Sequence, residues 1–355
     1  MKRLCQSGPT PIARHSLLVL FSVATDLGHL RMTSFPKYLD TIGNTPLLDI
    51  TSLVKSPKCE GIRVIGKAEF MNPGFSMKDR IVNHILREAL KSGKIQSGGT
   101  VVCASSGNTG ASVAMLCATL RLKAVIITSP KCSKEKMSAI KAYGATLLVE
   151  KDYMAKEVEL AKENPDWLMF DQYNNRLNSE AHYLTTGREI WDQTNGEVTH
   201  FVMSASTGGT ISGVGRYLKE KKPNAKIILA DPYGSVFYQY HRTGSIEQPT
   251  VKTEVEGAGK ESLTGVIDFK YIDDVVRVND ADAFAMCKQL ASSEGILVGG
   301  SAGLNVFAAI RLAQEVEEPC TIVTVLCDMG IKYLSKIYDD DWLQSKNLLV
   351  DEVPV

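Results

Sequence analysis

The segment TVVCASSGNTGASVAMLCATLRLKAVIITS, residues 100–129, reads as a strand, a glycine-rich turn, a helix and a second strand. The apolar runs at 100–105 and 123–129 predict buried strands, and the intervening residues 108–121 have the length and composition of a helix. A strand followed by a helix and another strand predicts a βαβ unit with parallel strands. This segment therefore indicates an α/β fold.

The same alternation continues on both sides of this unit. Further strands are predicted by the apolar runs at 63–70, 146–150, 200–206, 226–232 and 320–328. Further helices are predicted by the amphipathic segments at 77–93, 134–144, 210–222 and 303–316. Strands such as AVIIT and IVTVL are continuously apolar, which indicates sheets covered by helices on both faces. The polar residues 240–262 predict a long loop.

The composition excludes several classes of protein. The 355 residues are 44% hydrophobic and 23% charged, which is typical of a globular protein. Lys plus Arg and Asp plus Glu both total 40, so no overall basic field attracts nucleic acid. The eight cysteines form no CxxC pair and no zinc-site spacing, which favours a reducing compartment. We expect a protein that handles a small molecule, without nucleic acid, membrane or metal.

The first 31 residues differ from the rest. They contain one acidic residue, several basic residues and a short apolar core, LLVLFSVA, that is too short to span a bilayer. Two interpretations stay open: a targeting segment, or an upstream extension that does not fold, since Met32 would itself serve as a start. We expect residues 1–32 to be disordered or targeting. The expected location is cytoplasmic, or a mitochondrion or plastid if residues 1–31 are a transit peptide.

Three predicted strand-to-helix junctions are rich in small and hydroxyl residues. They are ASSGNTGAS at 104–112, STGGT at 206–210 and VGGSAGLN at 298–305. Backbone N–H groups at a helix start bind anions, so the first junction suits a carboxylate and the second a phosphate. The sequence has neither GxxxxGK[ST] nor GxGxxG, so the common nucleotide motifs do not explain the phosphate.

A fourth motif, NPGFSMKDR at 72–80, places Lys78 at the start of a predicted helix. By itself such a lysine is usually a solvated surface residue. Together with a phosphate cradle and a carboxylate-binding helix start, it suggests pyridoxal 5′-phosphate. That cofactor requires a Schiff-base lysine, a phosphate nest and a partner for its ring nitrogen.

These motifs resemble those of the fold type II pyridoxal-phosphate enzymes, the family of cysteine synthase and the catalytic core of cystathionine β-synthase. The resemblance covers Tyr38 to Trp342 and keeps the family's order of motifs. The matching motifs are IGNTPL, NPGFSMKDR, SSGNTG, DQYNN, AHYLTTGREIW, STGGT and EGILVGGSAG. It implies a two-domain architecture like that of the tryptophan synthase β subunit, with parallel-rich sheets, and a homodimer.

The resemblance also implies roles for individual residues. Lys78 would form the internal aldimine with the cofactor and act as the general base. Asn108 would bind the cofactor's 3′ oxygen, and Ser301 would face its ring nitrogen. The residues that would hold the substrate carboxylate are Ser105, Ser106, Thr109 and Gln172. The residues that would bind the phosphate are Ser206, Thr207, Gly208, Gly209 and Thr210.

The implied domain organisation places a larger cofactor-binding domain at 33–71 plus 183–345. A smaller mobile domain at 72–182 would close over the substrate, and residues 346–355 would form a tail. The chain ends at Val355, so we expect no regulatory domain after the catalytic core.

The implied reaction is β-replacement on L-serine, or on O-acetyl- or O-phospho-L-serine, through an aminoacrylate, in sulfur amino-acid metabolism. The partners would be the amino-acid substrate and a small nucleophile. The segment EVEGAGKES at 254–262 resembles cystathionine β-synthase in EVEGxG and departs from it in Lys-Glu-Ser. Phe75 and Ser105 stand where the family usually has Gly and Thr. The segments DQYNN, AHY, GGSAG and YLSKIYDDDW resemble cystathionine β-synthase, which is therefore the nearest family activity.

Other activities stay open. Within the family they are sulfide addition by a cysteine synthase, cyanide addition by a β-cyanoalanine synthase, and amination to 2,3-diaminopropionate. A different class is a catalytically reduced homologue that serves as a sensor or binds a partner protein. The intact Lys78, Asn108, STGGT and Ser301 argue against that class.

Overall fold

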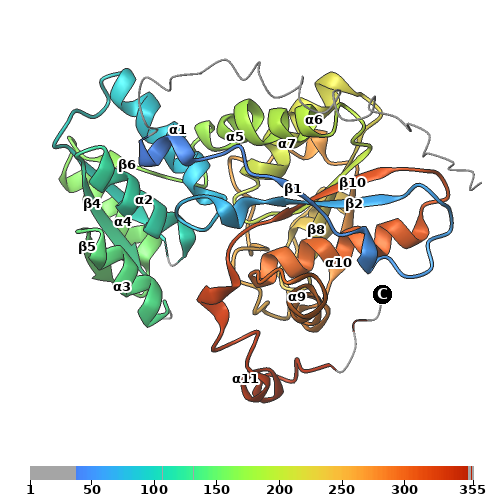
Figure 1. The fold of residues 1–355 in the computed structure, drawn as a ribbon. Helices are drawn as coiled ribbons and strands as arrows, with labels where there is room; N and C mark the ends of the chain where they lie inside the picture. The colour runs from blue at the N-terminus through green and yellow to red at the C-terminus, as the bar shows by residue number, and fades with distance from the viewer. Residues whose placement is uncertain (1–36, 106, 131, 351–352, 354–355) are drawn as a thin grey trace, which may run out of the picture. The chain divides into compact units, whose positions relative to one another are not determined.

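Two sheets with helices on their faces make up the computed structural model, which describes residues 37–105, 107–130, 132–350 and 353 (Figure 1). The larger sheet has the strand order β1-β2-β10-β7-β8-β9. Its strands are β1 Leu47–Asp49, β2 Arg63–Ala68, β7 His200–Ser204, β8 Lys226–Pro232, β9 Asp274–Val278 and β10 Thr321–Leu326. Strand β1 runs antiparallel to β2, and every other pairing among these strands is parallel.

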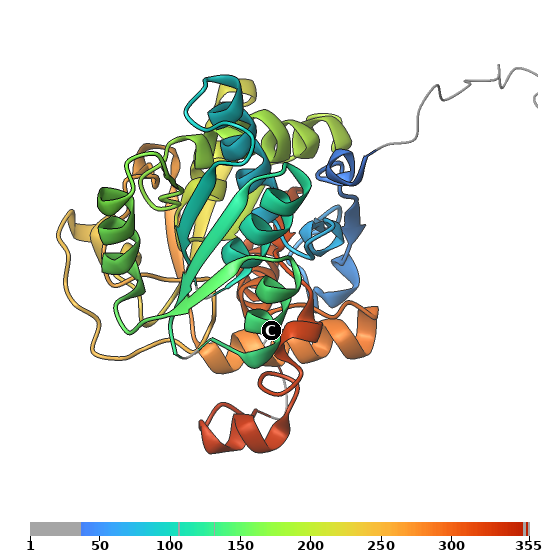
Figure 2. The ribbon, with the colours of Figure 1, turned by 90° about the vertical axis from the view of Figure 1, so that its left-hand side faces the viewer.

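The smaller sheet is parallel and has the strand order β5-β4-β3-β6. Its strands are β3 Thr100–Ala104, β4 Lys123–Thr128, β5 Thr146–Val149 and β6 Leu168–Met169. Figure 2 shows helices on both faces of this sheet. Because side chains alternate along a strand, Val101 and Cys103 pack with α1 and α2, whereas Val102 packs with α4.

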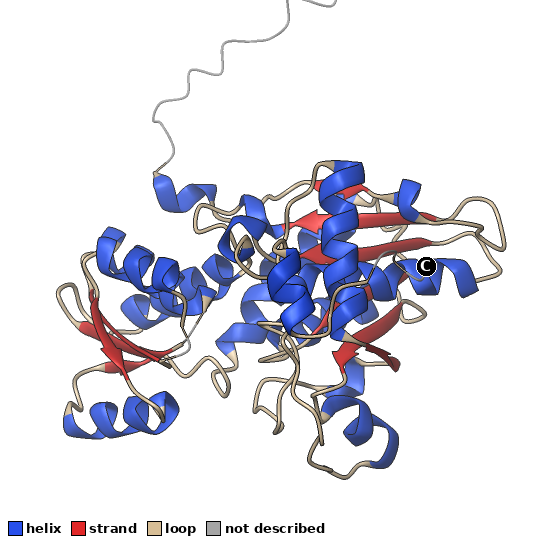
Figure 3. Ribbon diagram, turned by 90° about the horizontal axis from the view of Figure 1, so that it is seen from below, coloured by secondary structure: helices blue, strands red, loops and turns tan. Residues whose placement is uncertain are grey.

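Helices connect the strands and cover the sheets (Figure 3). The helices that follow strands of the smaller sheet, or precede them, are α1 Lys78–Lys91, α2 Asn108–Thr119, α3 Lys134–Ala142 and α4 Tyr153–Glu163. The remaining helices are α5 Leu177–His182, α6 Arg188–Gln193, α7 Gly209–Lys221, α8 Phe237–Thr243, α9 Asp280–Glu294, α10 Gly300–Glu315 and α11 Asp340–Ser345. A π-helical turn, Tyr183–Gly187, joins α5 to α6.

The local sequence explains where these helices form. In α1 the buried residues Ile81, Ile85 and Ala89 recur every four positions, so they make one apolar stripe. The two isoleucines each contribute roughly 1.5–3 kcal/mol when they are fully buried. At the start of α9, the Asn279 side chain accepts a hydrogen bond from the Asp282 N–H and caps the helix.

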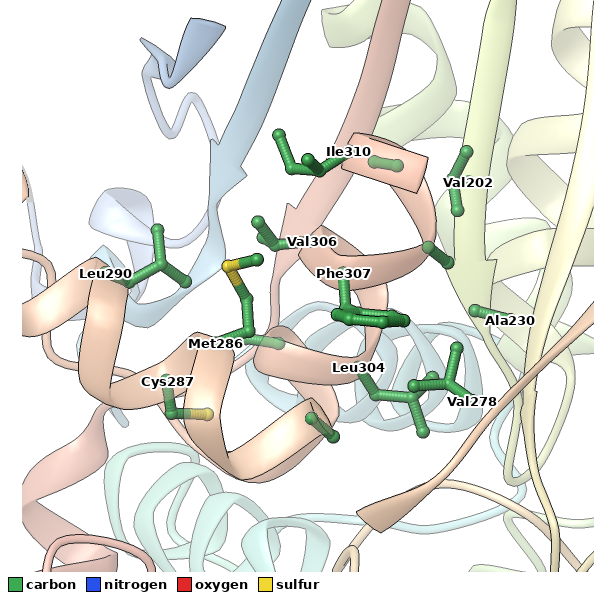
Figure 4. Close-up of a cluster of buried hydrophobic side chains, with 14 of the residues drawn as sticks. Val202, Ala230, Val278, Met286, Cys287, Leu290, Leu304, Val306, Phe307 and Ile310 are labelled. Atoms are coloured by element: carbon green, nitrogen blue, oxygen red, sulfur yellow. The ribbon is translucent and has the colours of Figure 1, made fainter. Parts of the chain in front are cut away.

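The main core of the larger sheet lies between the strands and the pair α9 and α10. Figure 4 shows Met286 and Leu290 of α9 beside Val306 and Phe307 of α10. Their neighbours Val202, Ala230 and Val278 come from β7, β8 and β9 and are also buried. A separate buried cluster on the other face includes residues of α6, α7 and α8. The larger sheet is therefore packed on both faces, as its continuously apolar strands predict.

The predicted α/β fold with parallel-rich sheets is confirmed. Each predicted strand and helix is present, with bounds that differ by at most three residues. The loop predicted from 240 begins later, because α8 extends to Thr243 and ends at Gly244, whose φ of 71° is left-handed. The boundaries of the two domains and the mobility of the smaller one stay predictions. Within the described residues, no helix combines the length and apolar character that a membrane span requires.

Candidate active site

Four helices begin at one cavity of about 220 Å³, which collects most of the predicted site residues. These helices are α1, α2, α7 and α10. The predicted residues that line the cavity are Lys78, Ser105, Asn108, Thr109, Gln172, Ser206, Thr207, Gly208, Thr210 and Ser301. Gly209 follows Gly208 as the first residue of α7. Ser106, predicted to bind the substrate carboxylate, lies outside the described residues.

Lys78 is the first residue of α1, and its amine reaches the cavity. Within the described chain, this amine makes no hydrogen bond or ion pair. Burial lowers the pKa of Lys78, and the nearby Cys327 and Asp328 only partly oppose that effect. A lysine with a lowered pKa is more often unprotonated, so it can act as a nucleophile toward a carbonyl and as a base.

The turn at 206–210 has the backbone of an anion site. Gly208 precedes α7 with a left-handed φ of 82°, and a Cβ at this position would collide with Ile267. Only glycine fits such a position without strain. The Thr207 hydroxyl accepts a hydrogen bond from the Gly209 N–H at 3.2 Å. The N-terminus of α7 therefore presents N–H groups and a positive helix dipole to the cavity.

His182 supports the phosphate turn, a role that the sequence analysis missed. Its Nε2 lies 3.2 Å from the Thr210 hydroxyl, and its Nδ1 lies 2.9 Å from the Thr186 hydroxyl. Burial, together with the positive charges of Arg80 and Lys78, holds the pKa of His182 well below its ordinary value. The imidazole is therefore neutral and fixes the Thr210 hydroxyl without adding charge. The motif AHYLTTG contains His182 and Thr186, whereas Thr210 belongs to the turn at 206–210.

Three predicted carboxylate-binding residues meet at the start of α2. The Ser105 hydroxyl accepts a hydrogen bond from the Gly110 N–H at 3.0 Å. The Thr109 hydroxyl donates to the Gln172 Oε1 at 2.7 Å, and the Gln172 Nε2 donates to the Ala104 carbonyl at 3.3 Å. Residues that are more than 60 positions apart in sequence are thus linked side chain to side chain.

Asn108 is held by charged partners that the sequence analysis did not assign. Its Nδ2 donates to Asp328 Oδ2 at 2.7 Å, and its Oδ1 accepts from Lys332 Nζ at 2.7 Å. The Tyr333 hydroxyl donates to the same Asp328 oxygen at 2.6 Å. Asp328 follows the apolar run of β10 by two residues. A polar residue at the carboxyl end of a predicted parallel strand is the signal that could have identified it.

A second group of charges lies at the cavity on the side of α3. The Glu256 carboxylate accepts hydrogen bonds from Lys136 Nζ and, at 2.7 Å, from Lys336 Nζ. Burial tends to raise the pKa of Glu256, but Lys136 and Lys336 outweigh it, so the pKa is lowered and the carboxylate is ionised. Lys136 lies in a segment that reads as an ordinary solvated helix, so its sequence gives no signal of this position.

The cavity fits pyridoxal 5′-phosphate. The Ser204 hydroxyl, from a cavity-lining residue, is buried without a hydrogen-bond partner within the described part of the chain. The Lys78 amine is also unpaired. The turn at Gly208 leaves the N-terminus of α7 free to bind an anion. An aldehyde that carries a phosphate would use the amine and the anion site together. Ser301, near the start of α10, and Cys327 both line the cavity.

Comparisons with known proteins agree with this fit. The pattern of the family described as "Pyridoxal-phosphate dependent enzyme" matches residues 38–328. The cystathionine beta-synthase of Apis mellifera is 36% identical over 325 residues, which are 88% of this chain and 63% of that protein. The O-acetylserine dependent cystathionine beta-synthase of Bacillus subtilis is 35% identical over 87% of this chain and 99% of that protein.

A solved structure gives the same result. O-acetyl serine sulfhydrylase isoform 3 from Entamoeba histolytica superposes with a TM-score of 0.81 and 30% identity, over 90% of this chain and 98% of that one. The chain spans about three fifths of the length of its Apis mellifera relative, at 63%. The predicted resemblance and the predicted cofactor are confirmed. The chain therefore belongs to the family of pyridoxal-phosphate dependent enzymes, among the relatives of cystathionine β-synthase and cysteine synthase.

Proposed function

We propose that this chain catalyses pyridoxal-phosphate-dependent β-replacement on L-serine or an activated L-serine, as the catalytic core of a cystathionine β-synthase does. One observation carries the proposal. The unpaired Lys78 amine shares a cavity with the helix starts of α2 and α7, which suit a carboxylate and a phosphate. An amino acid and the cofactor would therefore meet at the lysine.

In this proposal, Lys78, Asn108, Ser301 and the turn at 206–210 hold the cofactor. When bound, pyridoxal phosphate withdraws electrons from the α-carbon of an amino acid and so makes its α-proton acidic. Ser301 offers a neutral hydroxyl to the ring nitrogen rather than a carboxylate. A neutral partner leaves that nitrogen unprotonated, which moderates the electron withdrawal and suits elimination followed by addition.

Lys78 moves the proton. Its Nζ would take the α-proton of the amino acid as the general base and return it after the nucleophile has added. The lowered pKa that burial gives Lys78 makes the free amine available near neutral pH. Ser105, Thr109 and Gln172 would orient the substrate through its carboxylate, which places the α-proton toward Nζ. Ser106, which is also predicted to bind the carboxylate, lies outside the described residues.

The charges on the α3 side favour an amino-acid nucleophile. Lys136 and Lys336 flank the Glu256 carboxylate, so the group offers both positive and negative charge to an incoming molecule. A zwitterionic thiol such as homocysteine could pair with both signs, whereas sulfide needs neither. This supports cystathionine formation. The similarity to a sulfhydrylase keeps sulfide addition as the second candidate.

A panel of substrates tests the proposal. Purified holoenzyme would be given L-serine, O-acetyl-L-serine or O-phospho-L-serine, each with homocysteine, sulfide or cyanide, and products would be identified by mass spectrometry. We expect cystathionine from at least one donor. Lys78→Ala should lose turnover by at least about a thousandfold, because one residue is both attachment point and base. Cofactor binding without turnover of any pair, or turnover retained in Lys78→Ala, would refute the proposal.

Assembly, domain motion and location belong to the same proposal. We propose a homodimer in which the smaller domain at 72–182 closes over the bound amino acid and excludes water. We also propose a cytoplasmic location, or an organellar one if residues 1–31 are a transit peptide. Sedimentation analysis and fluorescent fusions with and without residues 1–31 test these points.

A further inference from the structure

Glu157 is a buried carboxyl that the proposed reaction does not use. It lies in the middle of α4, and its exposed fraction is only 3%. Helix α4 packs on β3 and β6 of the smaller sheet, so the carboxyl faces the carboxyl ends of these strands. Among the described residues, no lysine, arginine or histidine pairs with it. A buried carboxyl without a cation is rare and needs a reason.

The partners of Glu157 are two backbone N–H groups. Its carboxylate accepts a hydrogen bond from the Asp171 N–H at 3.4 Å, and the Ala104 N–H stabilises the same carboxylate electrostatically. Ala104 is the last residue of β3, and Asp171 follows β6 with a left-handed φ of 43°. These are the residues directly before Ser105 and Gln172. Both belong to the proposed site for the substrate carboxylate.

The Glu157 carboxylate lies beyond the last backbone hydrogen bond between β3 and β6. Strands β3 and β6 pair through Val101↔Leu168 and Val102↔Met169, and the last backbone bond joins the Phe170 N–H to the Val102 carbonyl. Beyond that point the Asp171 N–H donates to the Glu157 carboxylate, and the Ala104 N–H at the end of β3 stabilises it electrostatically. The carboxylate therefore takes the place of a further backbone contact between the two strands and holds the starts of the two loops together.

We propose that ionised Glu157 is a positioning residue, which holds Ser105 and Gln172 in register for the substrate carboxylate, so that carboxylate binding weakens when Glu157 takes up a proton. This inference rests on the proposed function of the cavity. A protonated carboxyl keeps one good acceptor oxygen, because its other oxygen becomes a donor. A neutral carboxyl is also a weaker acceptor than a carboxylate, so its contacts with the two loop starts weaken and the loops loosen.

The surroundings place this titration close to neutrality. Burial raises the pKa of Glu157 to about 7, although the two N–H groups oppose the rise. The Asp171 carboxylate raises it further. The other titratable groups near it are Cys103 on β3 and Tyr173 in the loop after β6, both of which are neutral at this pH. Among the described residues, no lysine, arginine or histidine is a cause of this raised pKa.

The test compares two ligands that differ only in the carboxylate. L-alanine has no β-substituent to lose, and L-alaninol has a hydroxymethyl group in place of the carboxylate. Their dissociation constants for the holoenzyme would be read from the absorbance of the bound cofactor between pH 5.5 and about 8.5. Because Lys78 titrates alike for both ligands, the ratio of the two constants isolates the carboxylate contact.

For the native chain we expect the preference for L-alanine to rise about tenfold between about pH 6 and pH 8. Glu157→Gln should show a smaller preference that does not change with pH, because an amide cannot ionise. Glu163→Gln, on the exposed side of α4, is the matched control and should behave as the native chain. A native pH profile in Glu157→Gln would overturn the inference.

Thermal unfolding gives a second readout that does not involve the ligand. The pKa of Glu157 in the folded chain, about 7, is above the ordinary 4.5, so the folded state binds the proton more tightly. Stability from this group is therefore lost as the pH rises from about 4.5 to about 7. The melting temperature of Glu157→Gln should rise relative to that of the native chain over this range, and a constant difference would contradict the assignment.

Two further outcomes distinguish a failure of the Glu157 inference from a failure of the proposed function. If the native holoenzyme binds L-alaninol as tightly as L-alanine at every pH, the carboxylate site itself fails and the proposed function fails with it. If Glu157→Gln does not fold, Glu157→Asp replaces it, because it keeps an ionisable group. That variant should keep a pH-dependent preference with a shifted midpoint, and an unshifted midpoint would overturn the role of Glu157.

Discussion

Two networks of charged side chains lie near Lys78, and they differ in how completely their charges are paired. The first, which we call the support network, consists of Lys67, Glu69, Arg80 and Glu189. The second, which we call the rim network, consists of Asn108, Asp328, Lys332 and Tyr333. Arg80 is two residues after Lys78 in α1, whereas Asn108 and Tyr333 line the cavity.

In the support network, every charged group is paired with another side chain of the protein. The Arg80 guanidinium donates to both oxygens of Glu69, each at 2.7 Å, and to both oxygens of Glu189 at 2.7 and 2.8 Å. Lys67 reaches Glu189 at 2.7 Å. Burial tends to raise the pKa of Glu189, but Arg80 and Lys67 hold it at about 2. Every charge here has a protein partner in a dry environment.

In the rim network, one polar atom is left without a partner among the described residues. Asp328 Oδ1 is buried without a hydrogen-bond partner in the described part of the chain, whereas Asp328 Oδ2 accepts from both Asn108 and Tyr333. Burial lowers the pKa of Lys332, so its charge is less firmly held than that of Arg80. We infer that the support network fixes the helix that carries Lys78. The rim network leaves groups that a ligand can complete.

The largest effect is expected in the support network. Arg80→Met would leave the carboxylates of Glu69 and Glu189 buried without their shared cation. Breaking a buried pair in this way costs about 3–5 kcal/mol of the free energy of unfolding. Urea unfolding of the apoprotein measures it. Arg311→Met removes an arginine from an exposed pair with Glu315 and should lose less than about 1 kcal/mol. Equal losses would show that the network contributes no more than a surface pair.

A change in the rim network should affect cofactor affinity more than the free energy of unfolding. Asp328→Ala releases the Asn108 amide and the Tyr333 hydroxyl, so cofactor affinity should fall about tenfold, which is about 1.4 kcal/mol. Titration of the apoprotein with pyridoxal phosphate measures this change. In Arg80→Met, the folded fraction should bind the cofactor with nearly native affinity.

A matched control removes an aspartate that does not contact the cavity. Asp340→Ala deletes an exposed carboxylate that pairs with Lys288, and it should leave cofactor affinity unchanged. If Asp328→Ala also leaves it unchanged, the rim network does not orient Asn108 for the cofactor. The contrast between the two networks would then be one of stability alone.

The two networks also illustrate which parts of the fold and of the site can be predicted from the sequence. Most of the strands, most of the long helices and the cavity residues at three junctions are predictable, because each leaves a local pattern of apolar runs or of Gly, Ser and Thr. The sequence analysis does not predict strands β1, β6 and β9. Helix α9 leaves a weaker pattern, since Ala283 to Cys287 are consecutive buried residues without a clear helical stripe. Nothing in its periodicity separates it from a strand.

The charged partners could not be predicted for a different reason. Lys136, Glu256 and Lys336 come from three distant segments, and a single charged residue in a sequence usually indicates solvent. Only the fold shows that Lys136 is buried at 7% exposure beside the cavity. The roles of Lys78, Asn108 and the other site residues came from the resemblance, and they stay predictions until variants are measured.

The smallest effect is expected at Phe75, where the rim network meets the lysine motif. Phe75 has a left-handed φ of 59° and a side chain that is 51% exposed, and its carbonyl accepts hydrogen bonds from the Met329 N–H at 3.1 Å and from Lys332 Nζ at 3.3 Å. A left-handed backbone costs a side-chain-bearing residue roughly 1–2 kcal/mol. Glycine removes that cost but loses roughly 0.5–1 kcal/mol through the entropy of the unfolded chain.

Phe75→Gly should therefore raise the free energy of unfolding by no more than about 1 kcal/mol, as measured by urea unfolding. Phe75→Ala keeps the Cβ and its strain while removing the ring, so it should show no gain. A gain in both variants would assign the effect to the exposed ring instead of the backbone. If only glycine gains, and cofactor affinity falls in that variant, then strain at Phe75 holds its carbonyl toward Lys332, and the rim network depends on a backbone that the support network does not need.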